Sequence, residues 1–170
     1  NLAIAFDAAA TGSGDPVSSI TFSHTCTGSN LILIVGFSMD TDVATGVTYN
    51  SISMTQAVKN VGTGSGNTSY IYYLFAPATG ANNVVISGSA AGLIRGTSVS
   101  YTGVSQSGFP DASTSADFTG TDDSLTVTTI ADNAWAVLFT GYQRATAAGA
   151  GSTQRATVSN ASVYDGNSAK

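Results

Sequence analysis

The sequence predicts an all-β protein, folded as an antiparallel two-sheet β-sandwich. Short apolar runs alternate along the whole chain with turns rich in Gly, Ser, Asn and Asp, which is the pattern of an all-β sandwich. Leu, Lys and Arg are sparse and Glu is absent, whereas Thr, Val, Ile and Tyr, which favour a pleated sheet, are common. Hydrophobic residues make up 42% of the chain and charged residues 9%, which argues against disorder.

The expected strands follow one another at short intervals. The first, residues 2–6, alternates Leu, Ile and Phe with Ala and so buries one face. Residues 31–35 (LILIV) and 135–139 (WAVLF) have no polar face, which predicts central strands covered on both sides. Residues 62–67 form a Gly-rich hairpin tip. The complete set of predicted strands is 2–6, 17–23, 30–39, 46–49, 52–58, 69–76, 82–87, 96–101, 124–129, 134–141 and 154–158.

The length, charge and cysteine content of the chain limit its domain number, its partners and its metal sites. A chain of 170 residues without an internal repeat or a break in composition fits a single domain over residues 1–170. Its 10 acidic and 5 scattered basic residues give a net charge of −5, so neither nucleic acid nor a membrane surface is expected as a partner. No apolar run approaches the roughly 20 residues of a membrane-spanning helix. The single cysteine, Cys26, excludes an intrachain disulfide and a multi-cysteine metal site.

Four segments of the chain have distinctive sequences. They are residues 23–38 (SHTCTGSNLILIVGFS), 47–55 (VTYNSISMT), 70–80 (YIYYLFAPATG) and 98–106 (SVSYTGVSQ), the last followed by FPDA at 109–112. In this order they resemble the opening segment, the hairpin, the aromatic strand and a later segment of a β-sandwich module that is found in phage virion proteins and large bacterial surface proteins. The resemblance covers most of the chain.

This resemblance implies a jelly-roll-like sandwich without enzymatic activity, and it supplies no catalytic residues. The sequence departs from the module in having Leu31 in place of an Arg, and Asn50-Ser51 in place of a Gly-Gly turn. The module closes with one or two further strands beyond the point where this sequence stops. We therefore expect the closing C-terminal strand either to be absent or to be supplied by a partner chain that pairs with an open sheet edge.

Asp40 and Asp42 are the candidate metal ligands. Together with nearby threonines they offer carboxylate and carbonyl oxygens, the ligands that calcium prefers. Their spacing lacks the full ligand loop of an EF-hand, and Asp is also common in exposed turns. The sequence predicts no cofactor, with calcium at Asp40 and Asp42 as the minor alternative.

His24 and Cys26 lie two residues apart, so on a strand their side chains point to the same side. Two ligands do not complete a zinc site, and no motif marks the oxyanion hole that a Cys-His nucleophile needs. We expect a packed thiol and an imidazole that caps a turn. The acidic residues all fall in predicted loops or at strand ends, so a glycosidase pair in an apolar setting is not expected either.

Tyr70, Tyr72 and Leu74 are the candidate contact residues. They share one face of a strand whose other face is equally apolar. One face must enter the core, and the other is a subunit contact or a platform that stacks on sugars, unless a long loop buries it. Trp135, inside another apolar run, is expected in the core.

The sequence thus predicts a protein that is not an enzyme and that acts through its surfaces. Abundant Ser, Thr, Gly and Asn with few charges suit dense packing of copies, because neighbours do not repel one another. The leading hypothesis is a virion structural protein, either a phage capsid decoration protein or a tail or fibre module, that contacts copies of itself and other virion or surface proteins. The alternative is a carbohydrate-binding or adhesive module of a secreted or cell-surface bacterial protein, with surface polysaccharide as its ligand.

Overall fold

The protein is all-β and its sheets are antiparallel, as predicted. The computed structural model describes residues 3–63, 66–117, 125–131, 133–141 and 151–167. Its strands are β1 (Ala5–Cys26), β2 (Ile32–Met39), β3 (Ala44–Tyr49), β4 (Ile52–Ser53), β5 (Thr55–Val61), β6 (Thr68–Phe75), β7 (Gly80–Thr102), β8 (Trp135–Thr140), β9 (Ser152–Val158) and β10 (Ala161–Asn167). The described part of the chain includes no helix with the length and hydrophobicity needed to cross a membrane.

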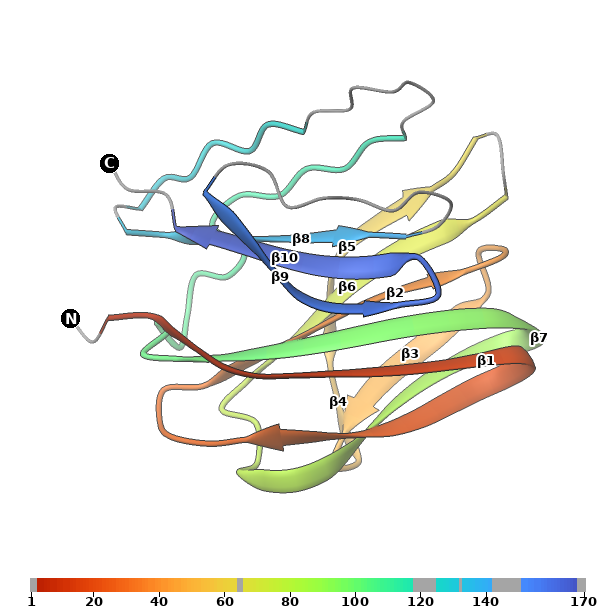
Figure 1. The fold of residues 1–170 in the computed structure, drawn as a ribbon, viewed down its shortest axis with the longest axis horizontal. Helices are drawn as coiled ribbons and strands as arrows, with labels where there is room; N and C mark the ends of the chain where they lie inside the picture. The colour runs from red at the N-terminus through yellow and green to blue at the C-terminus, as the bar shows by residue number, and fades with distance from the viewer. Residues whose placement is uncertain (1–2, 64–65, 118–124, 132, 142–150, 168–170) are drawn as a thin grey trace.

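Two long strands, β1 and β7, organise the larger sheet. They span 22 and 23 residues and pair with each other along almost their whole lengths (Figure 1). Irregularities in their register near Gly14 and Val17 bend the pair. The second half of β7 also pairs with β2, and its first half pairs with β3. The seven-stranded sheet, of order β4-β3-β7-β2-β6-β5 with β1 beside β7, consequently curls and is nearly barrel-shaped. The predicted sandwich and jelly-roll arrangement stay predictions.

Each long strand unites two predicted strands. Residues 2–6 and 17–23 were expected as separate elements, as were 82–87 and 96–101, because the Gly-, Ser- and Ala-rich segments between them resemble turns. These small residues lie where opposite walls of the curled sheet approach closely. A Cβ atom at Gly12 would lie 2.5 Å from Cδ1 of Phe22, and one at Gly96 would lie 2.6 Å from Cδ1 of Ile86. The glycines therefore serve close packing within continuous strands.

An inner core fills the curl of the larger sheet. It includes Leu33, Val35 and Phe37 of β2 together with apolar residues of β1, β3, β6 and β7. Every residue of β2 is buried, so the prediction that residues 31–35 form a strand covered on both sides is confirmed.

An outer core lies on the opposite face of β2. There the three-stranded sheet, of order β8-β10-β9, covers the larger sheet, and Val163 packs with Ile32 and Ile34 (Figure 1). The prediction that residues 135–139 form a central strand is wrong, because β8 lies at an edge of this sheet and Leu138 is 40% exposed. Its central strand is β10, which the sequence did not predict.

The remaining comparisons with the predicted strands concern residues 52–58, residues 124–129 and Leu2. The predicted strand 52–58 is divided into β4 and β5. Residues 125–129 are described and form no strand, so the predicted strand 124–129 is wrong there. Leu2 and Ser124, the first residues of two predicted strands, lie outside the described residues.

Candidate functional site

The outward side chains of β1, β7, β3 and β4 form one uncharged surface. Residues paired across an antiparallel sheet point to the same side, and the register aligns Thr21 with Val85 and Val85 with Thr48. We call this surface the hydroxyl face. It consists of Ser19, Thr21, Ser23 and Thr25 of β1, Ala81, Asn83, Val85 and Ser87 of β7, Gly46 and Thr48 of β3, and Ser53 of β4. None of these residues carries an ionisable side chain, and each is exposed or half-buried.

The hydroxyl face follows from an alternation that is visible in the sequence. Its residues alternate along β1, β7 and β3 with larger side chains that enter the inner core, such as Ile20, Ile86 and Val47. Because successive side chains of a strand point to opposite faces, burial of the apolar set exposes the hydroxyl set. A slip of one residue would exchange the two faces, so the core fixes this register.

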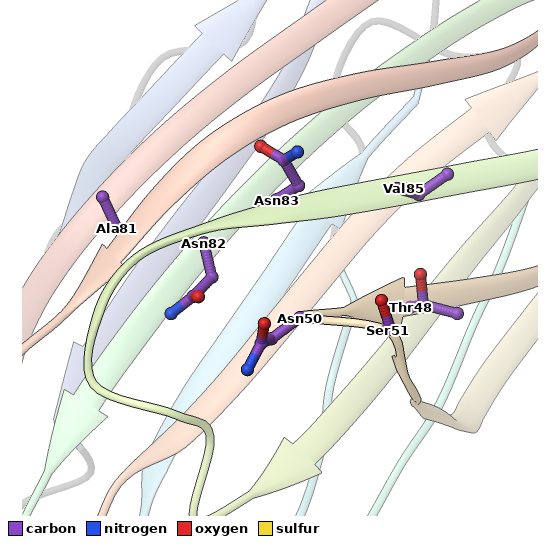
Figure 2. A pocket seen from close by; sticks show the side chains of 7 residues that line it. All are labelled: Thr48, Asn50, Ser51, Ala81, Asn82, Asn83 and Val85. Carbon is purple, nitrogen blue, oxygen red and sulfur yellow. The ribbon is translucent and has the colours of Figure 1, made fainter.

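Two hollows border the hydroxyl face. The first has a volume of about 310 Å³ and is lined by Thr48, Asn50, Ser51, Ala81, Asn82, Asn83 and Val85 (Figure 2). The second has a volume of about 380 Å³, shares Thr48 with the first, and is lined also by Thr45, Gly46, Val47, Ser53, Met54, Tyr72 and Ser87. Neither lining contains a charged residue.

The walls of the first hollow are the start of β7 and the turn between β3 and β4. Ala81, Asn83 and Val85 project from one side of β7, and Asn82 projects from the other (Figure 2). Asn50 and Ser51 form the turn, with φ angles of 48° and 64°. The backbone N–H of Asn50 donates to the carbonyl oxygen of Asn83 over 3.1 Å, which ties the turn to β7.

A buried hydrogen-bond network lies behind the hydroxyl face. His24 is 1% exposed, and its Nδ1 and Nε2 atoms lie 2.7 Å and 2.9 Å from the hydroxyl oxygens of Ser98 and Ser100. The Ser100 hydroxyl donates its proton to Oδ2 of Asp7 over 2.7 Å. Its oxygen must therefore accept from Nε2–H of His24, which leaves Nδ1 to accept from the Ser98 hydroxyl over 2.7 Å. The same hydroxyl lies 3.4 Å from the carbonyl oxygen of Ala10, which is the longer of its two contacts. A neutral imidazole satisfies the bonds to both serines and leaves Ser100 to donate to Asp7.

Burial and hydrogen bonding set the charge states in this network. Desolvation lowers the pKa of His24 to about 4, against an opposing effect of the Asp7 carboxylate. Partial burial of Asp7 raises its pKa, but hydrogen bonds from Thr27 and Ser100 outweigh burial and hold the pKa below its usual value. Burial also raises the pKa of the Cys26 thiol. At neutral pH the network thus pairs a neutral imidazole with an ionised carboxylate.

His24 and Cys26 point to the same side of β1, as predicted, and both are buried. The expectation that the imidazole caps a turn is wrong, because His24 bonds to two serines of β7 across the core. Burial separates both groups from solvent, and they line neither of the hollows described above. The arrangement is suited to holding β1 and β7 together.

Asp40 and Asp42 each bond to nearby protein groups. Asp42 accepts hydrogen bonds of 2.7 Å from the ammonium group of Lys59 and the hydroxyl of Tyr70. These bonds, that from Lys59 first, lower the pKa of Asp42. Asp40 accepts from the backbone N–H of Leu93 over 3.1 Å. Within the described residues no three His, Cys, Asp or Glu side chains are grouped as a metal site, and calcium at Asp40 and Asp42 stays the minor alternative hypothesis.

Tyr70, Tyr72 and Leu74 face the inner core. Tyr70 and Tyr72 are 2% and 8% exposed, and Leu74 is partly buried against the same cluster. The Tyr70 ring stacks on Phe37 with centroids 4.7 Å apart. These residues therefore offer no aromatic platform at the surface. Only the edge of Tyr72 reaches a hollow, the second one.

The opposite face of β6 belongs to the outer core. Tyr73 and Phe75 both contact Phe109, which comes from the loop after β7, and the Tyr73 and Phe109 ring centroids are 4.7 Å apart. Trp135 packs edge-on against Tyr101, with centroids 5.7 Å apart, so its predicted place in the core is confirmed.

One buried acid was missed by the sequence reasoning. Asp165 lies in β10 and is 3% exposed, which contradicts the expectation that the acidic residues lie in loops or at strand ends. It accepts hydrogen bonds of 2.8 Å from Nε of Arg155 and from the hydroxyl of Tyr101, and so ties the smaller sheet to the larger. The guanidinium group of Arg155 lies 4.2 Å from the centroid of the Phe6 ring. With few apolar residues in ASVYDGN, residues 161–167 gave no strong strand signal.

The site as a whole is an uncharged, hollowed surface. Behind it lies the network of His24, Ser98, Ser100 and Asp7, whose side chains form hydrogen bonds with one another. Comparison of the chain with protein-family models, curated proteins and solved structures finds no match.

Proposed function

We propose that this chain is a non-enzymatic structural module of a phage particle, either a capsid decoration protein or a tail or fibre module. In this role it resides in the virion and contacts copies of itself and other virion proteins. The observation that carries the proposal is the hydroxyl face, which spans four strands without an ionisable side chain. Copies that meet through such a surface neither repel one another nor bury unpaired charges, although the chain carries a net charge of −5.

The buried network supports a non-enzymatic role. The side chains with the most reactive chemistry, His24, Cys26 and Asp7, bond within the protein behind the hydroxyl face. A catalytic base or nucleophile must reach its substrate within hydrogen-bond distance, and His24 and Cys26 are buried. These groups contribute to the stability of a surface that acts by contact.

We also propose that the larger sheet belongs to the jelly-roll-like sandwich class. Its long strands bend so that one half of β7 pairs with β2 and the other with β3. The inner core lies between these two portions and takes residues from both. Strands that pass from one layer to another at bends and bulges are typical of sandwiches with closed corners.

Light scattering coupled to size-exclusion chromatography tests the assembly role. We expect a fixed oligomer for the native chain and dissociation for Thr21→Lys, which places a cation on the hydroxyl face next to Val85. Thr11→Lys is the matched control, because Thr11 is also exposed on β1 but lies outside that face. A native chain that is monomeric at every concentration would refute multi-copy contact, and equal dissociation of both variants would refute the role of the hydroxyl face.

A second candidate function, a carbohydrate-binding or adhesive module of a secreted bacterial protein, has separate support. It no longer rests on Tyr70 and Tyr72, since both rings are buried. The hollow lined by asparagine, serine and threonine favours it.

A further inference from the structure

The chemistry of the first hollow selects for one class of ligand. An anion requires Lys, Arg or clustered N–H donors, and a cation requires carboxylates, yet the lining carries no charge. An apolar ligand requires aromatic or aliphatic walls, whereas only Ala81 and Val85 are apolar here. The other lining residues carry amides and hydroxyls, which donate and accept hydrogen bonds from the same side chain. This mixture matches the hydroxyl groups of a sugar, each of which both donates and accepts.

The polar groups of the hollow are available to a ligand. The side chains of Thr48, Asn50, Ser51 and Asn83 make no hydrogen bond to any described residue. Asn82 differs, because its Nδ2 atom lies 3.3 Å from the hydroxyl of Tyr49 and 3.3 Å from the carbonyl oxygen of Thr79. The side chain of Asn82 projects from the other side of β7 and is engaged by the protein, so it is not counted among the groups that bind a ligand (Figure 2).

The turn at Asn50 and Ser51 keeps side chains where glycine would be favoured. Two-residue hairpin turns with positive φ at both positions favour Asn-Gly, and serine at the second position is a strained choice for that backbone conformation. This position carries a hydroxyl into the lining of the hollow instead. Ser51→Gly therefore removes a lining group while the turn keeps or improves its stability.

The size and position of the hollow indicate a short stretch of glycan. A volume of about 310 Å³ is near the lower end for small-molecule sites. The second hollow adjoins it at Thr48 and carries further hydroxyls of Ser53 and Ser87. A chain of sugar rings that occupies the first hollow can therefore continue across the hydroxyl face.

We propose that the hollow between the β3–β4 turn and the start of β7 is a binding site for a neutral saccharide, in which Asn50, Ser51 and Asn83 bond to sugar hydroxyls. This inference rests on the second candidate function, and it is an alternative to contact between copies at the same place, because the hollow shares Thr48, Asn83 and Val85 with the hydroxyl face. Each site is shallow and lacks an aromatic platform, so it binds weakly alone and gains strength when several copies engage one polymer.

Affinity electrophoresis in native gels tests the site. The gels contain a neutral polysaccharide, with dextran, galactomannan, mixed-linkage β-glucan and agarose used in turn, and alginate serves as the anionic comparison. We expect retardation in at least one neutral gel and none in alginate. Ser51→Gly and Asn83→Ala should each reduce that retardation at least fivefold, with thermal melting used to verify that both variants are folded. Thr55→Ala, an exposed change on β5, is the control and should migrate like the native chain.

Absence of retardation in all neutral gels would overturn the proposal. Retardation only in alginate, or retardation that folded Ser51→Gly and Asn83→Ala share undiminished with the native chain, would also overturn it. Light scattering on the same samples separates this result from the assembly role. A monomer that is retarded supports the saccharide site and contradicts multi-copy contact. An oligomer that no neutral gel retards supports multi-copy contact and contradicts the saccharide site.

Discussion

Acidification from pH 8 to pH 5 should destabilise this protein through a single buried imidazole, His24. In the folded chain the pKa of His24 is lowered to about 4 by burial, from an ordinary value of 6.5. Between these values the unfolded chain binds a proton that the folded chain does not bind. Stability therefore is fully present above pH 6.5 and falls as the pH decreases toward 4. Asp7, the charged neighbour of His24, stays ionised through this range because its own pKa is lowered.

The magnitude follows from the two pKa values. At pH 5 the unfolded imidazole is almost fully protonated and the folded one almost fully neutral, so the loss relative to pH 8 is about 2 kcal/mol. The loss approaches about 3 kcal/mol near pH 4. Solvent screening does not reduce this loss substantially, since His24 is 1% exposed. The hydrogen bonds act in the same direction, because a charged imidazole would require the Ser98 hydroxyl to give up its 2.7 Å bond to Nδ1 and donate instead to the carbonyl oxygen of Ala10, 3.4 Å away.

Urea unfolding at pH 8, 7, 6 and 5 measures this loss. His24→Gln supplies a hydrogen-bond donor and an acceptor but does not titrate. The free energy of unfolding of this variant should therefore change less between pH 8 and pH 5 than that of the native chain. Parallel curves for the native chain and His24→Gln would refute the reasoning. The imidazole proton resonances of the native chain give a second measurement that needs no variant, and a midpoint near 6.5 would equally contradict a buried neutral histidine.

Three further perturbations have expected outcomes. Asp165→Ala should lower the free energy of unfolding by about 3 kcal/mol in urea titrations, because it leaves the buried Tyr101 hydroxyl and the Arg155 guanidinium group without their acceptor; an unchanged midpoint would show that this contact does not join the sheets. Gly36→Val should cost about 2 kcal/mol, since a Cβ atom there would lie 2.5 Å from Cδ2 of Phe139; a variant as stable as the native chain would contradict the close contact between β2 and β8. EDTA should leave the melting temperature unchanged, because the candidate calcium ligands already bond to protein groups; a decrease that calcium reverses would establish the metal site.

The buried strands were predictable where local pattern and tertiary environment agree. The uninterrupted run at 31–35 indicated a strand covered on both faces, and β2 is such a strand. The run at 135–139 is likewise without a polar residue, but it lies at a sheet edge. The hydrophobicity of a run indicates that its side chains favour burial. It does not indicate whether other strands pair with the run on both sides.

The candidate site divides in the same way. The alternation of small polar and large apolar residues along β1 is written in the sequence, and it produces the hydroxyl face once the apolar set is buried. The aromatic residues Tyr70 and Tyr72 were interpreted as surface candidates because the strand is apolar on both faces. Coverage of the second face by Phe109 and the smaller sheet depends on contacts between distant segments, which no local pattern records.

By itself the sequence determined the secondary-structure class, the uncharged character of the surface and the strands with the strongest apolar runs, because these follow from composition and from a period of two. Tertiary structure alone decided that β1 and β7 run unbroken through their segments of small residues. Glycines such as Gly12 and Gly96 are needed there because the opposite walls of the curled sheet leave no room for a side chain. Tertiary structure also decided the environment of His24, whose partners Ser98 and Ser100 are 74 and 76 residues away along the chain. Interactions at such separations depend on how the sheet curls, and local residue preferences carry no information about that curl.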